Sequence, residues 1–283
     1  MIELERVVGL AFVQDGGRPG LLREGVPRGG ALIPSALAAA NRAVGNPEHA
    51  AGIERYGAIT IVARGDVTVA DDDARVWTLH DGERIELAWD GARRARFVAL
   101  QGGIDVPRVL GGRGTLVAAR IGGLEGRPLR RGDVLRTASE PITTAHALAW
   151  TPHQGAIRLV AGPDLDVYAP SAIDALTSRA WRLSTRSDRT GTRLEAPAIP
   201  WRDDAPAART TPMIAGAIEL PPGGEPIVLG VDHPTTGGYP VVALVAGVDL
   251  DRFHAIPLGR DVRFTTITID EARALLRQSG GTT

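Results

Sequence analysis

Glycine and proline interrupt this chain so often that only short secondary-structure elements fit between them. The 283 residues include 35 glycines and 20 prolines. The segments that they bound are short, rich in β-branched residues, and in several cases alternate apolar with polar positions, as half-buried strands do. The runs that we expect to be strands are Ile59–Ala63, Val67–Ala70, Arg96–Leu100, Ile157–Ala161, Pro226–Val231, Val241–Val245 and Val262–Thr268. We therefore predict a mainly β protein of barrels or sandwiches.

Helix signals are few and short, which predicts helices at the periphery of a β-rich fold. One run begins with Pro34 and stops at Gly45, with proline in the first turn and glycine just past the end. Others are expected over 171–178 and over 270–277, with Asp270 as N-cap. At roughly 150 residues per domain the length suggests two domains. We place the boundary in the irregular stretch 138–155, which gives β-rich domains over 1–145 and 155–283.

Two amino acids are missing from the chain, and their absence excludes several chemistries. There is no cysteine, so thiolate nucleophiles and disulfides are excluded. All 32 basic residues are arginine, so this chain has no Schiff-base lysine, Walker A lysine or biotinyl-lysine. A bound anion must be held by arginine forks, backbone N–H groups, hydroxyls or helix N-termini. The six histidines are scattered without metal-ligand spacing, so no metal site is expected.

Charge and hydropathy indicate which partners to expect. The net charge is −1, without the basic excess that nucleic-acid binding requires. The longest apolar run is about half of a membrane span, so no membrane association is expected. The first residues have no basic segment followed by an apolar one, so we expect no signal peptide and a cytoplasmic location.

The segment Ser184–Leu194 is the first candidate site. It holds three arginines, one aspartate and five hydroxyl residues, and a glycine interrupts it. Arginine can grip a carboxylate or phosphate through two parallel N–H bonds, and a neighbouring aspartate can fix the orientation of a guanidinium. The alternative is a solvated strand and turn with a surface ion pair. The candidate anion-binding residues are Arg186, Ser187, Asp188, Arg189 and Arg193.

The segment Asp232–Pro240 is the second candidate site and lies between two apolar β runs. Its two adjacent glycines let backbone N–H groups approach a ligand, and its threonine and tyrosine hydroxyls can hold a polar group. The alternative is a plain hairpin turn, because Gly-Gly between strands is a hairpin signal. The candidate substrate-binding residues are Asp232, Thr235, Thr236, Gly237, Gly238 and Tyr239.

These segments, together with several glycine-rich strings in the first half, resemble the biotin-dependent carboxyltransferase-like family. Its members include allophanate hydrolase subunit 2, KipA and the C subunit of the bacterial 5-oxoprolinase. The resemblance covers nearly the whole chain. The most specific strings are Ser187-Asp188-Arg189 with Gly191 and Arg193-Leu194, and Thr235-Thr236-Gly237-Gly238-Tyr239-Pro240. In the first half they include Gln14-Asp15, Arg18-Pro19-Gly20, Ala40-Asn41 and Gly102–Gly111.

The resemblance implies a fold and a site. It implies a cyclophilin-like β-barrel in the C-terminal domain, a related β-rich N-terminal domain, and a site between them. Candidates for that site from the first half are Gln14, Asp15, Arg18, Asn41 and Arg113. No acid–base residue is singled out.

The resemblance also implies a function and partners. We expect a component of an ATP-dependent enzyme that processes amides or lactams, foremost the C subunit of 5-oxoprolinase, an enzyme that opens 5-oxoproline to glutamate. The expected partners are a KipI-like protein, equivalent to the B subunit of 5-oxoprolinase, and an amidohydrolase-type A subunit. ATP is expected in the complex, with little activity from this chain alone. The alternatives are a carboxyltransferase subunit of the allophanate hydrolase or urea carboxylase type, and a non-enzymatic KipA-like antagonist of a kinase inhibitor.

At three places the chain departs from the family pattern. The usual G-A-M-D-P reads Ala31-Leu32-Ile33-Pro34 here, so a carboxylate is missing. The usual G-S-R-S-T reads Gly111-Gly112-Arg113-Gly114-Thr115, which lacks two hydroxyls. The segment around Thr210–Ala215 lacks S-E-G, and Glu219 stands in the place of the usual glutamine. These changes predict an altered substrate range or a lost reaction with the binding role kept.

Overall fold

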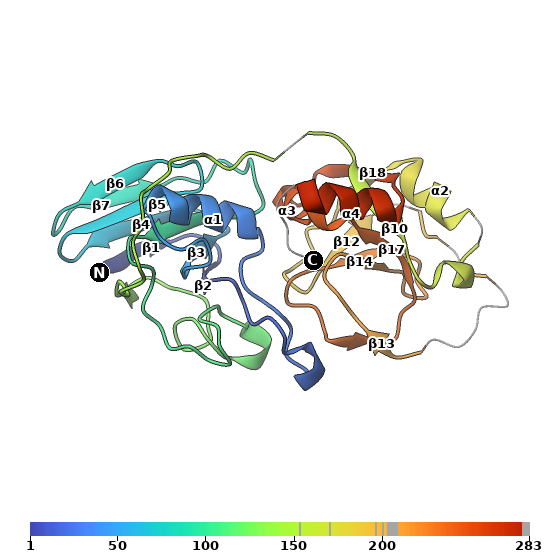
Figure 1. Cartoon of the computed structure of the whole chain (residues 1–283), viewed down its shortest axis with the longest axis horizontal. Helices are drawn as coiled ribbons and strands as arrows, with labels where there is room; N and C mark the ends of the chain where they lie inside the picture. The colour runs from blue at the N-terminus through green and yellow to red at the C-terminus, as the bar shows by residue number, and fades with distance from the viewer. Residues whose placement is uncertain (153, 170, 196, 200, 203–208, 279–283) are drawn as a thin grey trace. The chain divides into compact units, whose positions relative to one another are not determined.

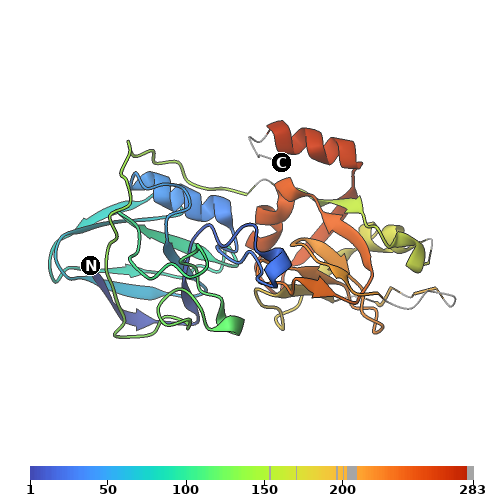
Figure 2. The same ribbon diagram turned by 60° about the horizontal axis from the view of Figure 1, so that its bottom comes forward.

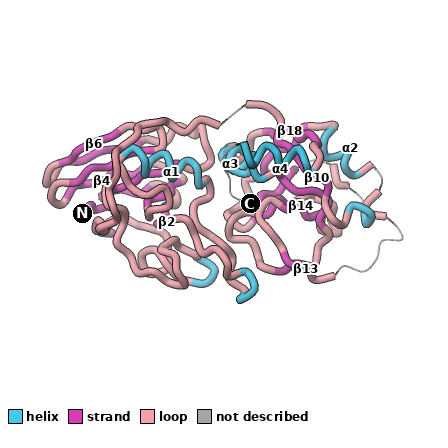
Figure 3. Tube along the Cα trace, in the orientation of Figure 1, coloured by secondary structure: helices cyan, strands magenta, loops and turns pink. Residues whose placement is uncertain are grey.

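The computed structural model describes residues 1–152, 154–169, 171–195, 197–199, 201–202 and 209–278, and it divides into two compact units. The first unit comprises residues 1–20 and 28–152, and the second comprises residues 21–27 and 153–283. Strands are more extensive than helices in both units, long loops connect them, and the helices are short (Figure 3). The predictions of a mainly β chain and of a barrel in its second half are confirmed, while the domain bounds 1–145 and 155–283 stay predictions.

Two antiparallel sheets build the first unit (Figure 1). The four-stranded sheet has the order β7-β4-β1-β9, with β1 at Ile2–Val7, β4 at Ile59–Ala63, β7 at Arg84–Leu87 and β9 at Val134–Leu135. The five-stranded sheet has the order β2-β3-β8-β5-β6, with β2 at Ala11–Gln14, β3 at Gly52–Arg55, β5 at Val67–Asp71, β6 at Val76–Leu79 and β8 at Arg96–Leu100. Both sheets contribute to one hydrophobic core, as the inner faces of a sandwich do.

Helix α1 (Pro34–Ala43) covers the five-stranded sheet. It begins with proline and ends just before Gly45, whose φ of 74° lies in the left-handed region that favours glycine. Leu37 of the helix packs against Gly52 of β3. A Cβ on Gly52 would lie 2.8 Å from the Cδ1 atom of Leu37. The missing side chain at Gly52 thus lets the helix approach the sheet. The short 3₁₀ helices η1 (Leu22–Glu24) and η2 (Val117–Ala119) lie in loops.

A buried ion network supports the five-stranded sheet of the first unit. Asp72, fully buried directly after β5, accepts a hydrogen bond from Arg96 Nε at 2.9 Å and pairs with Arg93. Both arginines also contact Asp73. Burial alone would raise the pKa of Asp73, but the hydrogen bond from Arg93 and the charges of both arginines hold it below its usual value. Neighbouring Arg55 is buried as well, which lowers its pKa to about 10.

The second unit is a closed seven-stranded barrel with the order β10-β17-β14-β15-β12-β11-β18 (Figure 1). Its strands are β10 at Ile157–Ala161, β11 at Ala180–Leu183, β12 at Gly191–Glu195, β14 at Ala217–Glu219, β15 at Ile227–Leu229, β17 at Val241–Val245 and β18 at Asp261–Thr266. The parallel pair β10 and β18 joins the two ends of the sheet, and the other barrel pairs are antiparallel. Inward side chains such as Trp181, Ile218 and Phe264 form its core. A separate two-stranded ribbon pairs β13 (Thr211–Pro212) with β16 (Thr236–Gly237).

Short helices surround the barrel of the second unit. They are η3 at Leu165–Val167, α2 at Ala172–Thr177, η4 at Gly247–Asp249, α3 at Leu250–Ala255 and α4 at Ile269–Gln278. Figure 2 shows α4 outside the barrel strands. The prediction that Asp270 caps this helix is wrong. Thr268 and Glu271 form a capping box instead, in which Thr268 Oγ1 accepts from the Glu271 N–H and Glu271 accepts from the Thr268 N–H.

Candidate functional site

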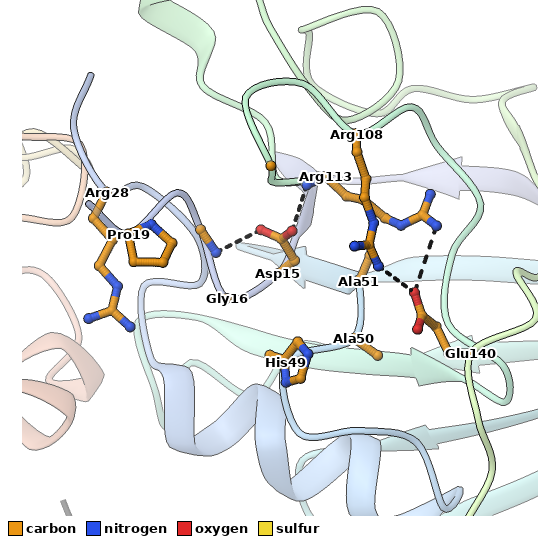
Figure 4. A pocket seen from close by; sticks show the side chains of 12 residues that line it. Asp15, Gly16, Pro19, Arg28, His49, Ala50, Ala51, Arg108, Arg113 and Glu140 are labelled. Atoms are coloured by element: carbon orange, nitrogen blue, oxygen red, sulfur yellow. Dashed lines mark hydrogen bonds and ion pairs between the residues drawn. The ribbon is translucent and has the colours of Figure 1, made fainter. Parts of the chain in front are cut away.

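A cavity of about 380 Å³ within the first unit is the candidate site (Figure 4). Loops build its wall: the turn after β2, the segment before β3, the loop that follows β8 and the chain near Glu140. Its lining residues are Asp15, Gly16, Gly17, Pro19, Arg28, His49, Ala50, Ala51, Arg108, Gly111, Arg113 and Glu140. Two of the residues predicted from the sequence, Asp15 and Arg113, are among them.

Backbone donors fix Asp15 at the cavity wall. Its Oδ1 accepts from the Gly17 N–H at 2.8 Å, and its Oδ2 accepts from the Arg113 N–H at 2.6 Å. Gly17 has a φ of 78°, and a Cβ there would lie 2.4 Å from the Arg28 carbonyl oxygen. Only glycine therefore permits this turn, which brings the loop of Asp15 to the loop of Arg113.

Two arginines share one carboxylate at the opposite wall. Arg108 Nη2 donates to Glu140 Oε1 at 3.2 Å, and Arg113 Nη2 lies 3.7 Å from the same oxygen. Figure 4 shows both guanidinium groups directed toward Glu140, with Arg28 on the other side of Gly16 and Pro19. Arg113 also donates to the Val106 carbonyl and to Asp105. Its guanidinium is thus held in one orientation, as a preorganised anion site requires.

The cavity lining carries three guanidinium groups and two carboxylates. The two oxygens of Asp15 are already occupied by backbone donors, while Glu140 is shared between two arginines. The positive charge in excess favours a small anion such as a carboxylate or a phosphate group. His49 adds an imidazole ring to the lining and lies beside Gly16, where a Cβ would be 3.0 Å from the His49 Cβ.

The other three first-half candidates serve the framework of this site. Arg18, 1% exposed, donates from Nε to the Val109 carbonyl and from Nη2 to the Gly114 carbonyl, both at 2.8 Å. It thereby ties the loop after β2 to the loop that carries Arg113. Gln14 donates to the Thr115 carbonyl at 2.9 Å. Asn41 of α1 donates to the carbonyl of Ala50, next to the cavity, at 2.9 Å.

The structure brings the two predicted segments of the second unit side by side. Arg189 Nε donates to Asp232 Oδ2 at 2.7 Å and Nη2 donates to Oδ1 at 3.1 Å, and the Asp232 N–H donates to the Arg189 carbonyl. Asp188 Oδ1 accepts from the N–H groups of Thr190 and Gly191. Asp232 is thus one carboxylate that fixes Arg189, and an anion-binding role for Asp188 and Arg189 stays a prediction.

The remaining candidates of the second unit lie at its surface. Arg186 is exposed and lies 3.7 Å from Glu225. Ser187 Oγ accepts from the Arg193 N–H at 2.9 Å, while the Arg193 side chain is exposed. Thr236 and Gly237 form β16, and the Thr235 carbonyl accepts from the Met213 N–H. Gly238 and Tyr239 are exposed. Their roles in binding a substrate stay predictions.

The buried pair of Arg189 and Asp232 leads to a prediction about stability. Each side chain is 10% exposed, so removing one partner leaves a buried charge poorly compensated. We expect Arg189→Met and Asp232→Leu each to lower the free energy of unfolding by about 3 kcal/mol. In urea denaturation, the double variant should lose at least about 1 kcal/mol less free energy of unfolding than the two single variants lose together. Strictly additive losses would contradict the prediction that Arg189 and Asp232 stabilise the fold as a pair.

Sequence reasoning missed Arg28, His49, Arg108 and Glu140 in the cavity, and it missed Glu219 in the barrel. Arg108 belongs to a family-like string, but nothing marked its side chain as part of a site. Glu140 lies in an irregular stretch whose path no periodicity predicts. Glu219 was noted only as a departure from the family, although a carboxylate inside a β-branched strand pattern is itself an unusual signal.

Burial raises the pKa of Glu219 from 4.5 to about 6, which makes the stability of the second unit depend on pH. Below about pH 4.5 the carboxyl is neutral in both the folded and the unfolded chain. As the pH rises to about 6 the unfolded chain ionises first, so the contribution of Glu219 lowers the free energy of unfolding by about 2 kcal/mol. We expect Glu219→Gln to remove this part of the pH dependence in urea denaturation between pH 4.5 and 7.5. An unchanged pH dependence would contradict the prediction.

Comparison with known proteins identifies the family. Residues 24–266 match the family model described as carboxyltransferase domain, subdomain A and B. The chain belongs to this carboxyltransferase domain family, as the resemblance predicted. It is 33% identical to the C subunit of 5-oxoprolinase from Escherichia coli strain K12, over 96% of this chain and 93% of that protein.

Solved structures of larger chains contain the same fold. The urea carboxylase of Kluyveromyces lactis matches with a TM-score of 0.84 and 25% identity, over 99% of this chain and 28% of the other. The protein TTHA0988 matches with a TM-score of 0.80 and 29% identity, over 93% of this chain. The chain spans about half of TTHA0988, 55% of its length.

Within the described ranges, the structure contains no helix with the length and hydropathy needed to cross a membrane. Among those same residues, histidine, aspartate and glutamate side chains form no group of three or more that could hold a metal ion.

Proposed function

We propose that this chain is the C-type subunit of an ATP-dependent enzyme that hydrolyses a lactam, 5-oxoproline, to glutamate. One observation carries the proposal. The similarity to the C subunit of 5-oxoprolinase extends over 96% of this chain and 93% of that protein, so it covers most of both chains. In the urea carboxylase of K. lactis, by contrast, the similar region is 28% of a much larger chain.

The chemistry of the cavity suits such a reaction. A lactam is a resonance-stabilised amide and a poor electrophile, so its hydrolysis at neutral pH needs activation. ATP supplies the phosphoryl group for this activation when it is bound in the complex. Negative charge then develops on oxygen, and fixed N–H donors stabilise it best. In this chain Arg108 and Arg113 would hold the phosphoryl anion, and the cavity of about 380 Å³ is large enough for such a group.

The proposal includes partner proteins in the cytoplasm. Relatives of this chain carry the name of one subunit of 5-oxoprolinase, the C subunit. We therefore propose a KipI-like B-type partner and an amidohydrolase-type A partner, and little activity from this chain by itself. No biotin is attached to this chain, because it contains no lysine.

Reconstitution with a panel of substrates tests the proposed function. The chain is purified with a B-type and an A-type partner from the same genome, and ATP hydrolysis is measured with 5-oxoproline, urea or allophanate. We expect stimulation by 5-oxoproline alone. Stimulation by urea or allophanate would instead favour the carboxyltransferase alternative, to which the 25% identity with urea carboxylase points. A tight complex that none of the three stimulates would favour a KipA-like antagonist.

A further inference from the structure

Glu219 in the barrel of the second unit is a largely buried carboxylate. Its side chain is 6% exposed, and it makes no hydrogen bond or ion pair with any residue that the structure describes. Its two oxygens are not among the fully enclosed polar atoms that lack a partner, so they retain contact with solvent. A largely buried carboxylate that pairs with no described residue and keeps solvent contact at its oxygens can accept a hydrogen bond from a ligand.

The strand register places this carboxylate on the outer face of the barrel. Ile218, its neighbour in β14, belongs to the barrel core, so Glu219 points to the opposite face. The pairing of β14 with β17 shifts register between these two residues, and such irregularities redirect side chains. Met213, Ala217, Leu229 and Val241 form a small apolar cluster outside the main core. Glu219 pairs across the sheet with Val241 of this cluster.

Arg193 lies on the same face as Glu219. Ile227 of β15 pairs with Glu219 on one side and with Arg193 of β12 on the other, and paired residues direct their side chains to the same face. Strands lie about 4.8 Å apart, so the two Cα atoms are separated by about 10 Å. The Arg193 guanidinium is exposed and has no ion-pair partner among the described residues. An acceptor and a cation thus share one face at a spacing that suits a small ligand.

The backbone of Gly237 packs directly against the carboxylate. A Cβ at this position would lie 2.9 Å from Glu219 Oε1 and 2.8 Å from Met213 Cε. The φ of Gly237 is not in the left-handed region, so the glycine serves this close approach and not a special backbone conformation. Gly237 belongs to the ribbon of β13 and β16, which brings the Thr-Thr-Gly-Gly-Tyr-Pro segment against Glu219.

We propose that Glu219 accepts the ring N–H of a lactam ligand on this face, while Arg193 binds the carboxylate of the same ligand. The inference rests on the proposed function, because 5-oxoproline carries one amide N–H and one carboxylate. An ionised glutamate can only accept a hydrogen bond, whereas a glutamine can both donate and accept. The site therefore selects ligands that present an N–H donor together with an anionic group. Glu219 and Arg193 belong to the second unit, whereas the cavity lined by Arg113 is built from residues of the first.

A matched pair of ligands tests the inference. Calorimetric titration of the full-length chain at pH 7.5 compares 5-oxoproline with N-methyl-5-oxoproline, which lacks only the N–H donor. We expect wild-type chain to bind 5-oxoproline at least about tenfold more tightly. Glu219→Leu should lose this preference, and Glu219→Gln should keep part of it. Arg193→Met should weaken the binding of both ligands and leave the preference intact.

A folding control and a separate activity assay distinguish failure of this inference from misfolding and from failure of the proposed function. Glu219→Leu removes an uncompensated carboxylate, so its thermal transition at pH 7.5 should lie at or above that of wild-type chain, which shows that it folds. Equal affinity of wild-type chain for the two ligands, a preference that persists in Glu219→Leu, or no binding of 5-oxoproline at all would overturn the inference. Failure of the proposed function is a different result, in which the reconstituted complex hydrolyses no ATP in response to 5-oxoproline.

Discussion

Arg113→Met is expected to lower the 5-oxoproline-dependent activity of the reconstituted complex by about 100-fold. The guanidinium of Arg113 lies at the cavity wall, where Glu140, Asp105 and the Val106 carbonyl hold it in place. Loss of one or two charge-assisted hydrogen bonds to an anion costs about 3 kcal/mol, and about 1.4 kcal/mol corresponds to a factor of ten. The steady-state rate of ADP release at saturating 5-oxoproline measures this effect.

Control variants separate a local effect from a general one. Arg131 is exposed and lies outside the cavity lining, so Arg131→Met should retain wild-type activity. Arg113→Met should also bind 5-oxoproline like wild-type chain, because the lactam is proposed to bind on the barrel of the second unit. Wild-type turnover by Arg113→Met would show that the cavity takes no part in the reaction.

Asp72→Asn is expected to lower the free energy of unfolding of the first unit by about 3 kcal/mol or more. Asp72 is fully buried and accepts from Arg96 Nε at 2.9 Å and from the Phe97 N–H at 3.2 Å, in addition to its contact with Arg93. Neutralising it leaves two largely buried arginines with less compensating charge, which is the costly way to break a buried pair. For a unit of this size the thermal transition should fall by roughly 6–12 °C in calorimetry.

Asp66 provides the matched control for Asp72. Its carboxylate pairs with His80, but the two side chains are 78% and 69% exposed. Exposed pairs contribute little, so Asp66→Asn should change the free energy of unfolding by less than about 0.5 kcal/mol. If Asp66→Asn lowered the free energy of unfolding as much as Asp72→Asn does, burial would not explain why the network of Asp72 stabilises the first unit.

The strands could be predicted from the sequence because their signals are local. Ile59–Ala63, Arg96–Leu100, Ile157–Ala161 and Val241–Val245 were expected with the bounds that the structure shows. The closure of the barrel by the parallel contact of β10 with β18 joins residues more than a hundred positions apart, so no local pattern marks it. The cap of α4 was misassigned because helical periodicity does not fix the first residue of a helix closely enough to choose between two nearby capping side chains.

The candidate site was less predictable than the fold. Asp15 and Arg113 were expected near a ligand, and both line the cavity. Arg18 and Asn41 carried the same sequence signals, but their donors bind backbone carbonyls inside the framework. Composition cannot distinguish these two situations, because the number of free donors depends on which carbonyls the fold brings near. Glu219 is the opposite case, because the sequence did not mark it as a site residue. Its burial, and its lack of a partner among the described residues, are properties of the folded chain.

Counting the reaction products tests whether this chain is a working component of a lactam hydrolase. The B-type and A-type partners are incubated with ATP and 5-oxoproline, with and without this chain, and glutamate and ADP are quantified in the same samples. We expect the two products to accumulate in a constant ratio and only when this chain is present. ADP and glutamate formation at the same rate without this chain, or no glutamate with it, would contradict the claim that it is a working component of a lactam hydrolase.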